Sequence, residues 1–161
     1  MPYLIDGHNL IPKMRGLSLQ RLDDEMELIQ RLQIFCRVRR QSVEVYFDKA
    51  APGRAGSSTY GMVKAVFVPL NSNADQAIRS RLQKLGRKAR NWKVVSSDRQ
   101  VQAEARYSQA EVIPSEEFAE LMENTLIQAI KNPADQKGLS EAEVDEWLQM
   151  FNQKPPEDKS K

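Results

Sequence analysis

The sequence is poor in the two residues that most often build compact metal and redox sites, since it has one cysteine, Cys36, and one histidine, His8. A disulfide within the chain is therefore excluded, as is a zinc site with several Cys and His ligands. An acid–base pair of two histidines is excluded too. Cys36 lies in the amphipathic stretch "RLQIFCRVRR", so we expect a small buried hydrophobic side chain there and not a nucleophile.

Long apolar runs are missing as well. None approaches the roughly 20 residues that cross a lipid bilayer, and the N-terminus lacks the basic and apolar segments of a secretory signal. We therefore expect a cytoplasmic protein with no membrane partner. The 161 residues contain 40% hydrophobic and 29% charged side chains, a composition typical of one globular domain of ordinary size.

What the sequence does contain is an alternation of short β-type runs and longer helical runs. The β-type runs, rich in Val, Ile, Phe and Tyr, are residues 2–6, 42–48, 62–70, 92–98 and 110–114. Helical periodicity is found over residues 18–40, 73–90, 98–109 and 114–131. This alternation predicts an α/β domain with a mostly parallel sheet of about five strands and helices on both faces.

Two further segments fall outside the alternation. Residues 49–61, "KAAPGRAGSSTYG", are predicted to form a long Gly- and Ser-rich loop. After the "NP" break, residues 132–152 predict an acidic helical extension and residues 153–161 a disordered tail, so the domain itself spans residues 1–131. The extension could pack on the body, contact a partner or shield a basic face. The sequence is silent on the oligomeric state.

Four aspartates fall at the ends of the predicted strands. Asp6 ends the first run, Asp48 ends the second and Asp98 ends the fourth. Asp75 opens the helix that follows the third run. Ligands bind outside the carboxyl ends of parallel strands, so all four carboxylates are predicted at one edge. Taken singly, Asp75 and Asp98 are equally well explained as helix caps or turn formers.

A cluster of carboxylates is costly because like charges repel, and a divalent cation relieves that cost. Oxygen ligands without useful His or Cys partners favour Mg²⁺ or Mn²⁺. Such an ion can lower the pKa of a bound water and stabilise the charge that develops on a phosphate. We therefore interpret the cluster as the metal-binding and catalytic site of a phosphodiester hydrolase, and we expect no organic cofactor.

A basic stretch accompanies the acidic edge, because no acidic residue lies between Asp75 and Asp98. Taken alone, such a stretch is more often a solvated helix face than a binding site. Beside an acidic pocket it favours contacts with a nucleic-acid backbone that do not depend on base sequence. The basic side chains that we assign to substrate binding are Arg79, Arg81, Arg87 and Lys88.

Four motifs, in order and in spacing, resemble the YacP-like NYN domain, a family of the PIN-like nuclease superfamily. They are "YLIDGHNLI" (3–11), "VYFDKA" (45–50), "NADQAI" (73–78) and "VVSSDRQVQ" (94–102), and the resemblance covers about residues 1–130. It implies a three-layer Rossmann-like or PIN-like fold and a metal-dependent endoribonuclease that cleaves RNA. Some members of the group act on messenger RNA at the ribosome. The family's acidic residues match Asp6, Asp48, Asp75 and Asp98.

The resemblance also assigns a role to Asn9, which matches the asparagine of the opening motif and would orient Asp6 or contact a phosphate. One position departs from the family pattern. Relatives often carry an acidic residue where this chain has Arg79. The change removes a candidate metal-binding carboxylate, leaves open whether one or two ions bind, and makes Arg79 a candidate phosphate contact.

Several alternatives stay open from the sequence. His8 is either a structural residue or a substrate contact, and the hydroxyls of Ser96 and Ser97 either bond within their turn or, as we assign for Ser97, bind substrate. A receiver domain needs an acidic pair after the first strand and a haloacid-dehalogenase-type phosphatase needs Asp-x-Asp, but "DGHN" supplies neither. The strongest rival is a non-catalytic RNA- or ribosome-binding module on a degenerate PIN-like scaffold.

Overall fold

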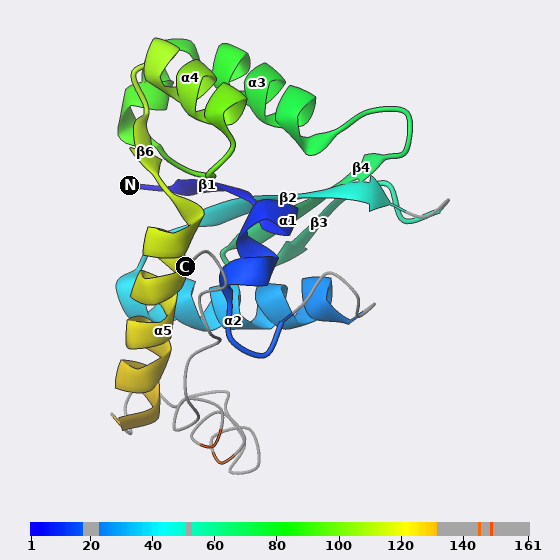
Figure 1. Ribbon diagram of the computed structural model, residues 1–161. Helices are drawn as coiled ribbons and strands as arrows, with labels where there is room; N and C mark the ends of the chain where they lie inside the picture. Colours follow the sequence, from blue (N-terminus) through cyan, green and yellow to red (C-terminus); the bar gives the residue numbers. More distant parts are fainter. Residues whose placement is uncertain (18–22, 51–52, 132–144, 146–148, 150–161) are drawn as a thin grey trace, which may run out of the picture.

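The centre of the molecule is one six-stranded sheet with the strand order β3-β4-β2-β1-β5-β6 (Figure 1). The architecture comes from a computed structural model that describes residues 1–17, 23–50, 53–131, 145 and 149. Every neighbouring pair of strands is parallel except β3 and β4, which form an antiparallel hairpin. The strands are β1 (Tyr3–Asp6), β2 (Val43–Ala50), β3 (Gly56–Tyr60), β4 (Val63–Pro69), β5 (Lys93–Val95) and β6 (Glu111–Ile113).

Five of these strands lie where the sequence predicted strands, and β3 does not. It falls inside residues 49–61, which we expected to be a loop, so that prediction was wrong for this part of the segment. The sequence of β3, "GSSTY", is polar and almost entirely exposed, and it lacks the apolar pattern that identifies a strand. An edge strand needs only backbone pairing with one neighbour, here from Gly56 opposite Phe67 to Tyr60 opposite Val63.

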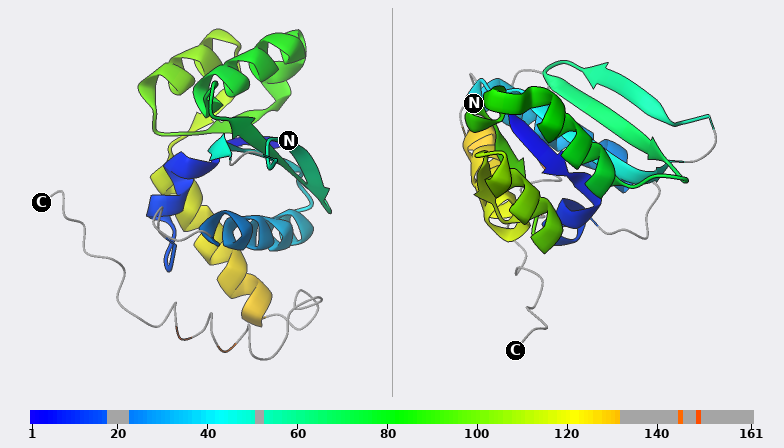
Figure 2. Two further views of the ribbon diagram at one scale, coloured as in Figure 1. Left: turned by 90° about the vertical axis from the view of Figure 1, so that its right-hand side faces the viewer. Right: turned by 90° about the horizontal axis from the view of Figure 1, so that it is seen from above.

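Helices flank the sheet, with α3 and α4 on one side and α2 and α5 on the other (Figures 1 and 2). Seen from above, α3 and α4 run side by side over the sheet, and the β3–β4 hairpin extends beyond them (Figure 2). The α-helices of the described residues are α1 (Gly7–Leu10), α2 (Asp24–Arg39), α3 (Ala74–Leu85), α4 (Arg99–Tyr107) and α5 (Ser115–Lys131). Two 3₁₀ turns are η1 (Ile11–Lys13) and η2 (Gly86–Asn91).

The helices agree with the predicted ranges except near two glycines. The helix predicted over 73–90 stops at Leu85, because Gly86 has a φ of +54° and the chain continues as the turn η2. The residues after Asp6, which lie outside every predicted helix, form the short helix α1 that begins at Gly7. Residues 18–22, the start of the first predicted helix, lie outside the described residues.

The strand β1 is buried on both of its faces, which explains its nearly continuous apolar sequence. Tyr3 and Ile5 join a cluster with side chains of α2 and α5. Leu4, between them, joins a second cluster with side chains of α3 and α4. Cys36 is fully buried in the first cluster, as its sequence context predicted. The central strand is thus held from both sides, which makes its carboxyl end a rigid place for a site.

The carboxyl ends of β4, β2, β1 and β5 share one edge, because these four parallel strands are neighbours in the sheet. Asp6 and Asp48 lie on two of these strands, and Asp75 and Asp98 lie at the starts of the helices that follow β4 and β5. The predicted extension over 132–152 and the tail over 153–161 fall outside the described residues, apart from residues 145 and 149. Of the helices that the structure describes, none combines the length and the apolar composition that crossing a bilayer requires.

Candidate active site

Asp6 lies at the centre of the shared edge, at the end of β1, and is only 6% exposed. The residue after it has to be glycine. A Cβ atom at Gly7 would lie 2.5 Å from Cε1 of Phe47 and 2.9 Å from the carbonyl oxygen of Tyr46, closer than real Cβ atoms approach other atoms. The "DG" pair therefore lets α1 pass directly against β2, and it sets Asp6 beside the end of the strand that carries Asp48.

Asp48 and Asp75 lie at the junction between β2 and α3. Oδ1 of Asp48 accepts a hydrogen bond from the backbone N–H of Ala74, the first residue of α3. Asp75 follows in the first turn of the same helix, where a negative charge is favoured by the helix dipole. The N-cap of α3 is Asn73, whose side chain accepts the N–H of Gln76 at 2.8 Å. Asp75 is thus free of the capping role that the sequence left open.

Asp98 is the N-cap of α4. Its Oδ1 accepts the backbone N–H of Gln100 at 2.8 Å and that of Val101 at 3.2 Å, which confirms the capping alternative for this residue. The buried hydroxyl of Ser96 accepts the N–H of Asp98 at 3.0 Å and donates to Oδ2 of Asp6 at 3.3 Å. Capping occupies Oδ1 alone, so the other carboxylate oxygen of Asp98 makes no hydrogen bond within the described residues.

The charge state of Asp6 reflects its crowded surroundings. Burial, together with the negative charges of Asp75 and Asp48, raises the pKa of Asp6 from its usual 3.8 to about 6. The hydroxyl of Ser96 and the backbone N–H of Asn9 act in the opposite direction, because both favour the ionised carboxylate. Asp6 therefore carries an unfavourable negative charge at neutral pH, and a nearby cation would stabilise it.

Asp75 connects the remaining carboxylates electrostatically. Burial raises its pKa, the negative charges of Asp98 and Asp48 add to the rise, and the positive charge of Arg79 opposes it. Because Asp75 also acts on Asp6, the four aspartates form one interacting group. The structure therefore brings all four predicted carboxylates together at the edge of the sheet.

The carboxylate oxygens of the four aspartates suit a hard divalent cation that takes part of its coordination shell from water and substrate. Among the described residues, no three His, Cys, Asp or Glu side chains converge tightly enough to hold an ion by themselves. Mg²⁺ commonly binds one or two carboxylates and completes its shell with water and substrate phosphates. A cluster of oxygen ligands around one buried, destabilised carboxylate fits that mode of binding, and it does not fit zinc or copper.

A family model for the YacP-like NYN domain matches residues 3–154 of the chain. The chain belongs to the YacP-like NYN domain family. NYN domains are nuclease-like, so the carboxylate edge lies in a nuclease-like domain. The match continues past α5, the last helix of the described domain. A comparison with curated proteins finds no match.

Two solved structures of the same relative share the fold of this YacP-like NYN domain. The crystal structure of Rae1 (YacP) from Bacillus subtilis superposes with a TM-score of 0.66, at 23% identity, over 94% of this chain and 92% of that one. A mutant of the same protein superposes with a TM-score of 0.62, at 23% identity, over 93% and 92% of the two chains. At this identity the likeness shows a common fold.

In this YacP-like NYN domain, Asn9 of α1 holds the turn after β5 and the start of α5 together. Its Oδ1 accepts the backbone N–H of Ser97 at 2.7 Å and the hydroxyl of Ser115 at 2.6 Å. The hydroxyl of Ser97 donates to Oε2 of Glu116 at 2.8 Å and accepts the N–H of Ser115 at 2.9 Å. Asn9 and Ser97, which we assigned to substrate binding, therefore lie beside Asp6 but use these atoms in bonds within the protein.

Of the four basic residues predicted to bind substrate, one lies near the carboxylates and two lie far from them. Arg79 is close to them, since it lowers the pKa of Asp75, and its Nη2 donates to Oε1 of Gln100 on α4 at 3.1 Å. Arg87 and Lys88 lie in η2, beyond the opposite end of α3. The twelve residues of α3 extend about 18 Å, so these two cations are remote from the carboxylate edge.

The fourth, Arg81, is engaged within the protein. Its Nε and Nη2 donate to the two carboxylate oxygens of Glu44 at 2.9 and 2.8 Å. Its guanidinium carbon lies 5.3 Å from the centre of the Trp92 ring. Glu44 is only 8% exposed, so the pair neutralises a buried charge on the face of the sheet. An RNA phosphate would have to compete with Glu44 for this arginine.

Two acidic residues at the edge were missed from the sequence. Oε2 of Glu25 lies 2.6 Å from Nε2 of His8, which agrees with the structural alternative for this histidine. Oε1 of Glu116 lies 3.3 Å from Nζ of Lys13, and the Ser97 hydroxyl holds the pKa of Glu116 below its usual value. Both contacts join segments far apart in the sequence, so no local motif could have indicated them.

Proposed function

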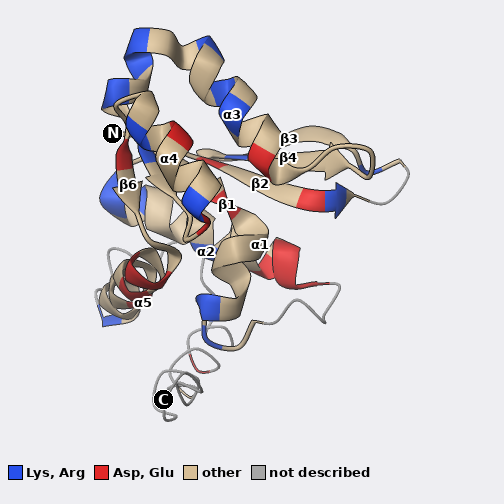
Figure 3. Cartoon of the chain, turned by 45° about the horizontal axis from the view of Figure 1, so that its top comes forward, with Lys and Arg blue, Asp and Glu red and all other residues tan. Residues whose placement is uncertain are grey.

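We propose that this protein is an endoribonuclease that uses Mg²⁺ or Mn²⁺ to hydrolyse RNA phosphodiester bonds, with messenger RNA on the ribosome as its substrate. The observation that carries the proposal is the buried carboxylate of Asp6, whose pKa of about 6 reflects burial and two neighbouring aspartates. A bound divalent cation would favour its ionised form. Two observations support an RNA substrate, namely membership of a nuclease-like family and the Lys and Arg residues spread over α3, η2 and α4 (Figure 3).

One or two of the carboxylates of Asp6, Asp48, Asp75 and Asp98 would bind the ion directly, and the others would reach it through bound water. Bound there, the ion would supply a water of lowered pKa and stabilise charge on the phosphate. The chain's own contribution is to fix the oxygens in place. Asp48 is tied to the start of α3, and Asp98 is tied to the start of α4, so neither carboxylate has to be ordered when substrate binds. Arg79, beside Asp75, would meet a phosphate of the RNA.

The proposal is tested by incubating the full chain with end-labelled single-stranded RNA, and separately with translating ribosomes, in Mg²⁺, in Mn²⁺ and in EDTA. Cleavage is expected with either ion and not in EDTA. Asp6→Asn and Asp98→Asn should each lower the rate at least about a hundredfold, as expected when groups that stabilise transition-state charge are lost. Asn is itself a good N-cap, so the second variant should keep α4 intact.

Asp23→Asn provides the matched control, because Asp23 is an exposed residue before α2 whose side chain makes no capping bond. It should cleave like the wild type. The protein is not a metal-dependent nuclease if the wild type cleaves neither substrate. The same holds if Asp6→Asn and Asp98→Asn cleave as fast as the Asp23→Asn control.

A second candidate function is favoured by a specific observation. Arg79 stands close to Asp75, at the position where relatives often carry an acidic residue. A cation there would suit a module that binds RNA or the ribosome without cutting it. RNA binding that persists in EDTA, with no turnover in Mg²⁺ or Mn²⁺, would select this function over the nuclease.

A further inference from the structure

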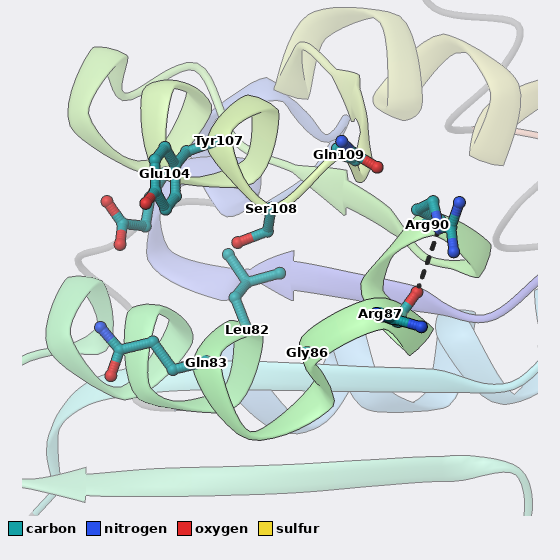
Figure 4. A pocket seen from close by; sticks show the side chains of 9 residues that line it. All are labelled: Leu82, Gln83, Gly86, Arg87, Arg90, Glu104, Tyr107, Ser108 and Gln109. Atoms are coloured by element: carbon teal, nitrogen blue, oxygen red, sulfur yellow. Dashed lines mark hydrogen bonds between the residues drawn. The ribbon is translucent and has the colours of Figure 1, made fainter.

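A pocket of about 550 Å³ lies between α3, η2 and α4, away from the carboxylate edge (Figure 4). Leu82, which is buried, forms its apolar floor. Arg87 and Arg90 of η2 line one end, and Glu104 and Tyr107 of α4 line the other (Figure 4). The pocket takes no part in the chemistry proposed for the aspartates, because the length of α3 separates the two.

Tyr107 is unusual among the residues that the structure describes. It is 87% exposed, more than any other large hydrophobic side chain in the described part of the chain. An aromatic ring left in water beside a pocket offers a flat surface on which a planar group can stack. Nucleic-acid bases are such groups, and stacking on them does not depend on base identity.

The two arginines of the pocket have no carboxylate partner among the described residues, in contrast to Arg81, which is paired with Glu44. Nε of Arg90 lies 3.5 Å from the carbonyl oxygen of Arg87, a long and therefore weak contact within η2. Unpaired guanidinium groups attract phosphate by charge-assisted hydrogen bonds. This end of the pocket is therefore suited to a phosphate group.

Glu104 decides how a nucleotide would be oriented. Its carboxylate would repel a phosphate, and it lies at the same end as Tyr107, away from the arginines (Figure 4). A carboxylate at the base end can accept a hydrogen bond from a base amino group. Ser108 and Gln109 add further polar groups to the wall. The charges of the pocket therefore match a base at the Tyr107 end and a phosphate at the arginine end.

We propose that this pocket binds one nucleotide of single-stranded RNA, with its base on Tyr107 and its phosphate at Arg87 and Arg90. Insofar as that RNA is a substrate, the inference rests on the proposed function. The nucleotide would lie several residues along the strand from the bond held at the carboxylate edge, since the helix α3 separates the two sites. The pocket would then favour long substrates over short ones by adding binding energy remote from the reacting bond.

The test is a fluorescence anisotropy titration of the full chain with a 5′-labelled, unstructured single-stranded RNA of about 20 nucleotides, long enough for more than one contact region. EDTA is present throughout, so the result does not depend on cleavage. Tyr107→Ala is expected to weaken binding about tenfold, and Tyr107→Phe, which keeps the ring, should bind like the wild type. Arg90→Ala should weaken binding and reduce the salt dependence by about one ion.

Arg106→Ala is the matched control, because Arg106 is an exposed arginine of α4 that does not line the pocket. It should have a much smaller effect than Arg90→Ala. Equal losses in Arg90→Ala and Arg106→Ala would mean diffuse attraction to positive charge and would overturn the proposal. So would unchanged binding in Tyr107→Ala with an unaltered melting temperature.

The same variants are titrated with fluorescein-labelled polyglutamate. Weaker binding of polyglutamate with unchanged binding of RNA would identify a site for acidic peptides and overturn the RNA assignment. The outcome is separate from that of the nuclease proposal. RNA binding that depends on Tyr107 in a protein that never cleaves would support the pocket and reject the nuclease. Metal-dependent cleavage, with RNA binding unchanged in the Tyr107 variants, would support the nuclease and reject the pocket.

Discussion

The hydroxyl of Ser96 donates a hydrogen bond to Oδ2 of Asp6 across 3.3 Å, although the two residues are 90 positions apart in the sequence. The hydroxyl oxygen of Ser96 also accepts the backbone N–H of Asp98. The Ser96 hydroxyl therefore holds the side chain of Asp6 and the backbone of Asp98. Because it is fully buried, it performs this role without contacting solvent.

Replacing Ser96 by Ala should raise the pKa of Asp6 above its value of about 6, because the hydroxyl favours the ionised carboxylate. The pKa is measured from the side-chain carboxyl carbon by NMR in metal-free protein. Ser57→Ala, on the exposed strand β3, is the control and should leave the pKa unchanged. An unaltered Asp6 pKa in Ser96→Ala would mean that the hydrogen bond has no influence on the charge of the site.

Asp6→Asn should stabilise the metal-free protein at high pH. The folded-state pKa of Asp6 is about 6, above its usual 3.8, so the folded protein holds this proton more tightly than the unfolded chain does. Stability is therefore lost as pH rises from about 4 to 6, by at most about 3 kcal/mol. Urea unfolding in EDTA should show the variant to be more stable than the wild type at pH 8, with the advantage absent at pH 4. A constant difference at both pH values would contradict the origin assigned to the shift.

Gly7→Ala should destabilise the fold by about 1–3 kcal/mol, because its Cβ atom would overlap the Phe47 ring and the carbonyl oxygen of Tyr46. Urea unfolding measures the change. Gln30→Ala, at an exposed position of α2, should have little effect. Wild-type stability in Gly7→Ala would show that α1 can move away from β2 at little cost.

Asn9→Leu should lower both stability and RNA cleavage, because it removes the oxygen that accepts the N–H of Ser97 and the hydroxyl of Ser115. A buried N–H left unsatisfied costs about 1–3 kcal/mol, and the part-buried N–H of Ser97 should cost less than that. Ser115→Ala removes one of the two donors and leaves the other bond intact, so it should cost less. If Asn9→Leu lowers cleavage with no change in urea unfolding, Asn9 contacts the substrate directly instead of positioning the turns.

Arg81→Met should destabilise the protein by about 1–3 kcal/mol, because it leaves Glu44 buried without its partner. The double variant Arg81→Met/Glu44→Gln should recover part of that loss, since no unpaired charge then remains. Urea unfolding of the single and double variants completes the cycle. If Arg81→Met weakens RNA binding while the free energy of unfolding is unchanged, its main partner is the phosphate backbone and not Glu44.

Much of the fold could be read from local pattern. The strands β1, β2, β4, β5 and β6 are recognisable in the sequence as short runs rich in Val, Ile, Phe and Tyr. Their alternation with helices implies that they are parallel. From that topology, the positions of Asp6, Asp48, Asp75 and Asp98 followed, because the carboxyl ends of neighbouring parallel strands meet at one edge. Arg81 could not be interpreted in this way, since its distance from Glu44 depends on how α3 lies over β2.

The sequence by itself determined five of the six strands and which carboxylates face the edge of the sheet, because side-chain period and strand order are local and topological properties. Only the tertiary structure decided the polar edge strand β3, the bonds of Asn9, the pair between Arg81 and Glu44, and the pKa of Asp6. Each of these depends on burial and on contacts between segments far apart in the chain. Such contacts leave no periodic trace in the sequence, because they are made once and by side chains that are equally common on the surface.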